Sequence, residues 1–339
     1  MYANVLPCVA RAQACFDPRT ELDKIAKHCK TSVKTVQRAL SILRRTSEEY
    51  WPQHIRDIRA LGLKTIIIHS NKGLRNLHRI EDLRHQGIPL YRYWYSYRAT
   101  LDGHHIYSYF APAGQEQEFT QVLERLGEVD YGETIPVKPL YTEPHSLSKP
   151  SKAPTLPKRV PLLLAALIYA SLDLSPLATL KELTNITPVL RERLGEISTI
   201  YTLDLRKLLR AYRALSKHGL LGRALLLLVT PNTKRPIPLY IEVKKECFAN
   251  LYQLVSETWS APSIFLGKEI AAAVMVLPDE LADKAQQVLS GCIEYSNVIT
   301  RGYGTTIPIE MYDPFKATWS LEPQPLLKHL KPYLSKKKK

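Results

Sequence analysis

The two halves of the chain resemble each other, and this internal similarity constrains the fold more than any other feature of the sequence. The residues Thr-Ile-Pro-Val at 134–137 recur as Thr-Ile-Pro-Ile at 306–309, an offset of 172. Upstream, the pentapeptides at 127–131 and 291–295 both begin with Gly and end with Tyr, at an offset of 164. An offset that grows along the chain is what small loop insertions in a duplicated unit produce. The sequence therefore predicts two copies of one structural unit.

A proline-rich segment separates the two halves. Residues 142–161 contain five prolines, which leave no room for a regular helix or a fully hydrogen-bonded strand. At 339 residues the chain also exceeds the size at which a single hydrophobic core stops growing. We therefore expect six segments: a helix-turn-helix domain at 1–61, a ferredoxin-like domain at 62–143, a linker at 144–160, a second winged-helix-like domain at 161–235, a second ferredoxin-like domain at 236–318 and a basic tail at 319–339.

The order of apolar patterns in each half predicts a ferredoxin-like sheet domain. In the first half, strands are predicted at 63–69, 90–100, 104–110 and 129–140, and helices at 72–85 and 115–126. This βαββαβ order gives an antiparallel sheet with helices on one face. The second half follows the same order at its end, with a short strand before Gly267, a strand at 270–277, a helix at 280–290 and a strand from 293. Its beginning differs, because 224–229 and 237–243 supply two strands where the first half has one. The predicted class is α+β, with two repeats of a helix-turn-helix (winged-helix-like) domain followed by a ferredoxin-like domain.

Residues 21–45 have the pattern of a helix-turn-helix. Leu22, Ile25 and Ala26 give a short first helix its apolar face, and Ser32 can cap a second helix. The first turns of a recognition helix meet base edges, and basic residues near its end suit phosphates. The candidate DNA-contacting residues here are Lys30, Thr31, Ser32, Lys34, Thr35, Gln37, Arg38, Arg44 and Arg45. An ordinary helical hairpin with a solvated basic face is the alternative interpretation.

The second half offers a weaker counterpart of this segment. Thr187 and Pro188 can cap and start a helix that carries Arg191 and Arg193. Thr187, Arg191 and Arg193 are therefore the candidate DNA-contacting residues of this half. A basic amphipathic helix predicted at 203–218 is explained equally well by structural packing and by DNA contact.

Basic charge is concentrated in the N-terminal helical segment. The formal net charge of the chain is +15. Residues 19–79 carry 14 Lys or Arg against 5 Asp or Glu, a net of +9, whereas residues 101–143 carry 2 against 8, a net of −6. Such segregation favours selective binding of a polyanion over solvation alone.

The cysteines indicate neither a disulfide framework nor a zinc site. There are five, an odd number, and they contain no Cys-x-x-Cys pair, which suits a reducing cytosol. The longest apolar run, 161–172, is far shorter than the ~20 residues that span a bilayer. The N-terminus also lacks the pattern of a signal peptide. We therefore expect a cytoplasmic, nucleoid-associated protein with no membrane partner.

The sequence resembles a tandem-duplicated leucine-responsive regulator of the Lrp/AsnC family. The resemblance is carried by the helix-turn-helix at 22–45, by the run at 187–193, and by the hairpin glycines Gly103 and Gly267. It implies an N-terminal helix-turn-helix joined to a ferredoxin-like effector and oligomerisation domain. It also implies a small-molecule effector at the sheet domains, and pairing of such units within the chain or in a homo-oligomer.

Together these features predict a transcriptional regulator. The expected protein binds double-stranded DNA sequence-specifically, with the duplicated chain acting as a covalent pseudo-dimer that presents two recognition helices. It is expected not to be an enzyme and to need no cofactor. The adjacent His104 and His105 lack an evident third ligand, so no metal site is expected either.

Two other functions stay open. Siroheme decarboxylases resemble the same two-domain architecture, and a tetrapyrrole enzyme of that kind needs basic and His side chains that converge on carboxylates. The candidates are His69, His78, His85, His104 and His105. Alternatively, the chain is an RNA-binding or architectural chromatin protein. Alternate residues of a strand share a face, so Tyr91, Tyr93, Tyr95 and Tyr97 form a stripe that could stack on bases, although such stripes are more often core.

Overall fold

The computed structural model describes the chain in several separate stretches. The described residues are 5–12, 16, 21–46, 57–71, 95–124, 127–137, 210, 214, 238–257, 263–276, 279–304, 312–313 and 318–319. The predicted linker at 144–160, the second winged-helix-like domain at 161–235 apart from two residues, and the helix at 72–85 lie outside them. The predicted strand at 224–229 and the basic tail from 320 onward also lie outside. The domain boundaries therefore stay a prediction.

Three helices form a compact N-terminal unit: α1(Val5–Ala12), α2(Leu22–His28) and α3(Val33–Thr46). Ser32 caps α3 as predicted, because its Oγ accepts a hydrogen bond from the Thr35 backbone N–H at 3.1 Å. Lys30 turns the chain between α2 and α3 with a φ of 49°. The apolar residues of the three helices, among them Val9, Ile25 and Leu43, meet in one buried cluster. The helix-turn-helix fold expected from the sequence is thus present at the level of backbone and core.

The first half supplies a four-stranded antiparallel sheet. Its elements are the 3-10 helix η1(Ile58–Leu61), β1(Leu63–Ser70), β2(Tyr95–Thr100), β3(His105–Pro112), α5(Glu116–Leu123) and β4(Glu128–Pro136). The strands lie in the order β2-β3-β1-β4. This order, with α5 between β3 and β4, is that of a ferredoxin-like fold.

The second half supplies four more strands in the corresponding order. Its elements are β5(Pro238–Lys244), the 3-10 helix η4(Lys245–Cys247), α10(Phe248–Glu257), β6(Ser263–Leu266), β7(Ile270–Val276), α11(Asp279–Val288) and β8(Ile293–Gly304). These strands lie in the order β6-β7-β5-β8. Two short strands, β9(Tyr312–Asp313) and β10(Thr318–Trp319), pair separately. Helix α10 is absent from the sequence-based prediction, although Phe248, Leu251 and Leu254 have helical spacing and are buried.

The two sheets join along both edges into one closed eight-stranded barrel, which differs from the two separate sheet domains expected from the sequence. Strand β2 pairs with β8, and β4 pairs with β6. Closure satisfies the backbone groups of all four edge strands, which would otherwise be open to pairing with another chain.

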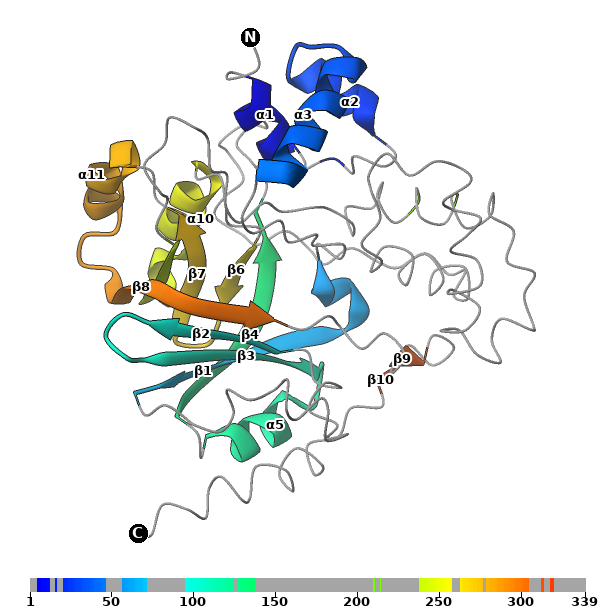
Figure 1. Ribbon diagram of the computed structural model, residues 1–339. Helices are drawn as coiled ribbons and strands as arrows, with labels where there is room; N and C mark the ends of the chain where they lie inside the picture. Colours follow the sequence, from blue (N-terminus) through cyan, green and yellow to red (C-terminus); the bar gives the residue numbers. More distant parts are fainter. Residues whose placement is uncertain are drawn as a thin grey trace.

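The apolar core is divided between the outside and the inside of the barrel. Outside, α10 and α11 cover the strands of the second half, and α5 lies on the strands of the first (Figure 1). Inside, Ile67, Ile106, Tyr240, Phe265 and Ala272 form one cluster from strands of both halves. Tyr97 of the predicted tyrosine stripe is 3% exposed and is therefore core, and so are Tyr107 and Tyr109 of the neighbouring strand, at 0% and 2% exposed. Tyr91 and Tyr93 lie outside the described residues.

None of the helices in the described ranges has the length and apolar character needed to cross a membrane.

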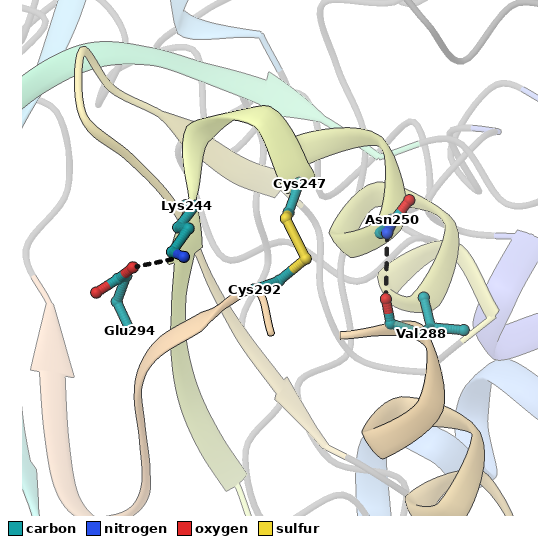
Figure 2. Close-up of a disulfide and its surroundings, with 6 residues drawn as sticks. All are labelled: Lys244, Cys247, Asn250, Val288, Cys292 and Glu294. Atoms are coloured by element: carbon teal, nitrogen blue, oxygen red, sulfur yellow. Dashed lines mark hydrogen bonds and ion pairs between the residues drawn. A yellow bond between two sulfur atoms is a disulfide. The ribbon is translucent and has the colours of Figure 1, made fainter. Parts of the chain in front are cut away.

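Two disulfides correct the expectation that the cysteines are unpaired. Cys8 of α1 is bonded to Cys29 at the end of α2, and Cys247 of η4 is bonded to Cys292 just before β8. Figure 2 shows the second bond beside the Lys244–Glu294 ion pair and the Asn250 hydrogen bond to Val288. The partners are 21 and 45 residues apart, so their spacing carries no motif and only the tertiary fold brings them together. Cys15 lies outside the described residues.

Candidate functional site

Most of the predicted DNA-contacting residues lie around the start of α3. Lys30, Ser32, Lys34 and Arg38 are exposed, while Thr31, Thr35 and Gln37 are partly buried. Ser32 and Thr35 are engaged with each other, since their hydroxyl oxygens lie 2.9 Å apart at the helix cap. Arg44 and Arg45 belong to the last turn of α3. Thr187, Arg191 and Arg193 lie outside the described residues.

Another group of polar side chains gathers at one end of the barrel. The ends of β1 and β5 meet the beginnings of β3, β7, β4 and β8 there, so both hairpins, 101–104 and 267–269, lie at this end. His69 comes from β1, His104 from the hairpin between β2 and β3, Glu242 from β5 and Tyr295 from β8. The cluster therefore takes residues from both halves of the chain.

Three of these side chains form a continuous hydrogen-bonded relay. Glu242 Oε2 lies 3.0 Å from His69 Nδ1, and His69 Nε2 lies 2.7 Å from His104 Nδ1. A carboxylate can only accept, so His69 donates to Glu242 from Nδ1 and accepts from His104 at Nε2. The other ring nitrogen of His104, Nε2, has no hydrogen-bond partner within the described part of the chain. The relay thus ends in a ring nitrogen that is free to exchange a proton.

Tyr240 completes the buried end of the relay. Its hydroxyl donates to Glu242 Oε1 at 2.7 Å, and the Glu242 side chain is only 7% exposed. Burial raises the pKa of Tyr240 well above its ordinary value, and the negative charge of Glu242 adds to this effect. Tyr240 therefore stays a neutral donor that fixes the Glu242 carboxylate against His69.

Tyr295 packs against both histidines. Its ring lies 4.5 Å from that of His69 and is stacked on that of His104 at 5.1 Å, between centroids. Its hydroxyl donates to Asp102 Oδ1 at 2.9 Å. Burial raises the pKa of Tyr295 to about 12, and the charges of Asp102 and Glu242 contribute, whereas a hydrogen bond with Thr100 opposes the rise.

Asp102 is the anionic anchor of the hairpin. Desolvation alone would raise its pKa, but hydrogen bonds from Thr100, Tyr295 and the His104 backbone lower the pKa to about 2. Thr100 donates to Asp102 Oδ1 at 2.6 Å. Asp102 is therefore ionised at neutral pH and holds the neutral phenol of Tyr295 in place.

Arg98 introduces a cation inside the barrel. It is paired across the ladder with Ile106, a residue of the interior cluster, and so faces the same side. Its Nη1 donates to Ser96 Oγ at 2.9 Å, and no carboxylate in the described stretches lies within ion-pair distance of it. Burial lowers the pKa of the Arg98 guanidinium, with Tyr240 opposing the shift. Arg98 is only partly buried by its exposed surface, but a desolvated charge with no counterion among the described residues is still costly, so this group is suited to binding an anion.

Sequence reasoning identified part of this site. His69 and His104 belong to the histidines proposed for a tetrapyrrole site, and the fold brings them together. His105 faces the other side of β3, where its Nδ1 lies 2.8 Å from the Tyr97 hydroxyl. His78 and His85 lie outside the described residues.

Arg98, Asp102, Tyr240, Glu242 and Tyr295 were not singled out from the sequence. Four of these are charged or phenolic residues at strand positions that face into the barrel. The sequence does not show which face of a strand points inward, so it could not single them out. No group of three or more His, Cys, Asp or Glu able to hold a metal ion occurs among the described residues.

Comparison with known proteins gives a likeness to solved structures. No protein-family model matches the sequence, and no curated protein matches it. The crystal structure of the siroheme decarboxylase NirDL matches 98% of this chain and 99% of its own, with 11% identity and a TM-score of 0.45. The same enzyme in complex with an iron-uroporphyrin III analogue matches 97% of this chain and 98% of its own, with 11% identity and a TM-score of 0.43.

These comparisons correct the expected function. The matched structures are those of a siroheme decarboxylase, so they point to the enzymatic alternative rather than to the expected DNA-binding transcriptional regulator, which is not proposed again. The resemblance to leucine-responsive regulators is kept only at the level of fold, as a helix-turn-helix unit combined with ferredoxin-like strand order. At 11% identity and these TM-scores the likeness transfers no substrate or mechanism, so the activity is argued below from the site itself.

Proposed function

We propose that this chain is an enzyme that removes a carboxyl group from a carboxylated tetrapyrrole, the enzymatic alternative that the sequence offers. The observation that carries the proposal is the His69–His104 pair, which is tied to Glu242 at one end and ends in His104 Nε2, a ring nitrogen that meets no partner in the described ranges. Such a relay is suited to delivering one proton at a defined position.

The proposed reaction needs a proton donor and no change of oxidation state. The bond between the carboxyl carbon and its neighbour breaks, carbon dioxide leaves, and the electron pair left behind takes up a proton to form a C–H bond. A His104 ring that carries both protons can donate one from Nε2, and its Nδ1–H then stays hydrogen-bonded to His69 Nε2. The negative charge of Glu242 stabilises the positive charge that the histidine pair carries before the transfer.

The interior arginine supports a substrate with more than one carboxylate. Arg98 can hold one carboxylate through charge-assisted hydrogen bonds while another leaves, because its guanidinium presents several donors in a fixed plane. The rings of Tyr295 and His104 are stacked on each other and supply flat surfaces for a large aromatic ligand. An eight-stranded barrel is filled by its own side chains. The tetrapyrrole ring would therefore lie at the end of the barrel, and only a carboxylate side chain of it would reach inward to Arg98.

We also propose that the architecture is duplicated. We take the two halves to be repeats of one ferredoxin-like unit, each preceded by a helix-turn-helix. Support comes from the corresponding strand orders of the two halves and from the sequence repeats at 134–137 and 306–309. In this arrangement the chain supplies both members of a pseudo-dimer.

The test is a turnover assay with siroheme, in which mass spectrometry follows the loss of carbon dioxide from the tetrapyrrole. We expect His104→Gln to lower kcat by about 10²–10⁴-fold with little change in KM, since it removes the proton donor but not the binding groups. Arg98→Gln is expected to act mainly on KM, because it removes a group that binds the substrate in both ground and transition states.

The matched control is His105→Gln, which changes the next histidine along the chain, at the start of β3, whose side chain faces away from the relay. Its kcat is expected to stay within a few-fold of the parent chain. If siroheme is not decarboxylated by the parent chain, or if His104→Gln is as active as the parent, the proposed function is wrong.

A further inference from the structure

The barrel has two corresponding junctions at the end that carries the site. At the first junction, the hairpin 101–104 between β2 and β3 meets Tyr295 near the start of β8. At the second junction, the hairpin 267–269 between β6 and β7 meets Asp130 near the start of β4. Each junction joins the hairpin of one half to the last strand of the other half, and each lies at one of the two seams that close the barrel. A duplicated fold thus offers two equivalent places for a ligand.

The second junction is filled by the chain itself. Asp130 Oδ1 accepts from the Lys268 N–H at 2.9 Å and from the Tyr131 N–H at 2.7 Å. Its Oδ2 accepts from the N–H groups of Glu269 and Ile270, both at 3.1 Å. Successive backbone N–H groups that converge in this way form an anion-binding nest. Here the anion is the carboxylate of Asp130, and both of its oxygens are used.

Close backbone contact leaves no space at the second junction either. A Cβ atom at Gly132 would overlap the carbonyl of Leu266, and a Cβ atom at Gly267 would overlap the Asp130 carboxylate. The Lys268 ammonium lies 4.1 Å from the centre of the Tyr131 ring, so this cation also has an internal partner.

The first junction differs from the second in how its hairpin meets the neighbouring strand. The side chains of its hairpin, Asp102 and His104, reach the neighbouring strand, and His104 Nε2 is left without a partner in the described part of the chain. Leu101 at the hairpin tip is 71% exposed. On β2, the Arg98 guanidinium likewise has no counterion among the described residues. Among the described residues, the first junction thus has a ring nitrogen without a hydrogen-bond partner, and the strand that leads into its hairpin carries a cation without a counterion.

We infer that the chain has a single tetrapyrrole site, at the first junction, and that the Asp130 carboxylate closes the corresponding second junction. This inference rests on the proposed function. It adds that the two halves are not equivalent: one holds a substrate, and the other holds a carboxylate of its own chain in the place where a ligand anion would bind.

The test is a stoichiometric titration of the full chain with siroheme, followed by the absorbance of the bound tetrapyrrole at protein concentrations far above the dissociation constant. We expect an end point at one siroheme per chain. An end point at two would overturn the inference while leaving the proposed function intact, whereas a complete lack of binding would overturn the proposed function.

Two variants locate the site. Arg98→Gln, at the first junction, is expected to weaken siroheme binding by about 10–100-fold, the range that a hydrogen-bonded charge contributes. Lys268→Ala is the matched control, because it removes an exposed cation at the second junction, and its dissociation constant is expected to stay within about twofold of the parent value. A loss of affinity in Lys268→Ala together with unchanged affinity in Arg98→Gln would place the ligand at the second junction and overturn the inference.

Discussion

At the scale of single residues, the environment decides what each tyrosine can do. Tyr97 is 3% exposed and packs on the outside of the barrel against Tyr107 and His105, so it is a core residue with a satisfied hydroxyl. Tyr295 lies at the barrel end, and its hydroxyl is held by an ionised carboxylate 193 residues earlier in the chain. The same side chain is therefore structural in one place and part of a titratable cluster in the other.

Asp102→Asn tests the link between this cluster and stability. The pKa of Asp102 in the folded chain, about 2, lies below its ordinary value of 3.8, so the ionised group stabilises the fold above about pH 4 and loses this effect as the pH falls towards 2. Asp102 is exposed, so we expect a loss on the order of 1 kcal/mol at neutral pH. Chemical denaturation of both proteins between pH 7 and about 2 measures the difference.

The two unfolding free energies should converge at the acid end of that range. Tyr295→Phe is the matched background, because the phenol that Asp102 holds is then missing and Asp102→Asn should cost less. A difference that stays constant down to the lowest pH would contradict the assigned pKa direction.

At the scale of elements, covalent links hold short helices that have little stability alone. Helices of 8 to 14 residues are marginal in water, and most of their stability comes from packing. Cys8–Cys29 ties α1 to α2, and Cys247–Cys292 ties η4 to the start of β8. The second disulfide also links the residues just after β5 to those just before β8, and these two strands carry the cross-strand neighbours Glu242 and Tyr295.

Removing the Cys247–Cys292 bond should lower the free energy of unfolding more than removing the Cys8–Cys29 bond. A disulfide restricts the unfolded chain in proportion to the logarithm of the loop that it closes. For separations of 45 and 21 residues, this relation gives about 4 and about 3 kcal/mol. Paired Cys→Ser variants under non-reducing conditions measure both values by denaturant unfolding.

A reductant supplies the control for the disulfide prediction, because it should abolish the difference between the parent chain and each Cys→Ser pair. Identical unfolding of the oxidised and reduced parent chains would mean that these bonds do not form.

At the scale of the whole molecule, closure of the barrel creates the site. His69 and Glu242 are 173 residues apart and meet because the two sheets pair along both edges. One seam joins β2 to β8 and the other joins β4 to β6. A change that opens either seam should therefore disturb both the stability of the fold and the geometry of the relay.

Gly132→Ala should destabilise the fold by about 1–3 kcal/mol or more, because the new methyl group would overlap the Leu266 backbone at the β4–β6 seam. Gly302→Ala is the matched control at the other seam. Its Cβ would lie 3.5 Å from the Tyr97 carbonyl, an ordinary contact, so we expect a change within about 0.5 kcal/mol. Denaturant unfolding compares the two variants, and equal costs would show that the seams are not packed as described.

The sequence by itself determined the local structure. The Ser32 cap, the short helices, the hairpin at Gly103 and the alternation of β3 depend on residues within one or two turns or strand positions of each other. A short stretch of sequence is therefore enough to predict these features, and the structure has them at the predicted positions. Helix α10 is the exception, because its apolar spacing was present in the sequence but was not recognised.

Only the tertiary structure decided how the two halves meet. Alternation of apolar and polar residues shows that one face of a strand is covered, but it does not show which element covers that face. Nor does it show which strand pairs with a sheet edge, because an edge can pair with any exposed edge of suitable register. The pairing of β2 with β8, the contact of His69 with Glu242 and the Cys247–Cys292 bond all join residues far apart in sequence. Such contacts form because closing the barrel satisfies every edge strand at once, and no short motif encodes that requirement.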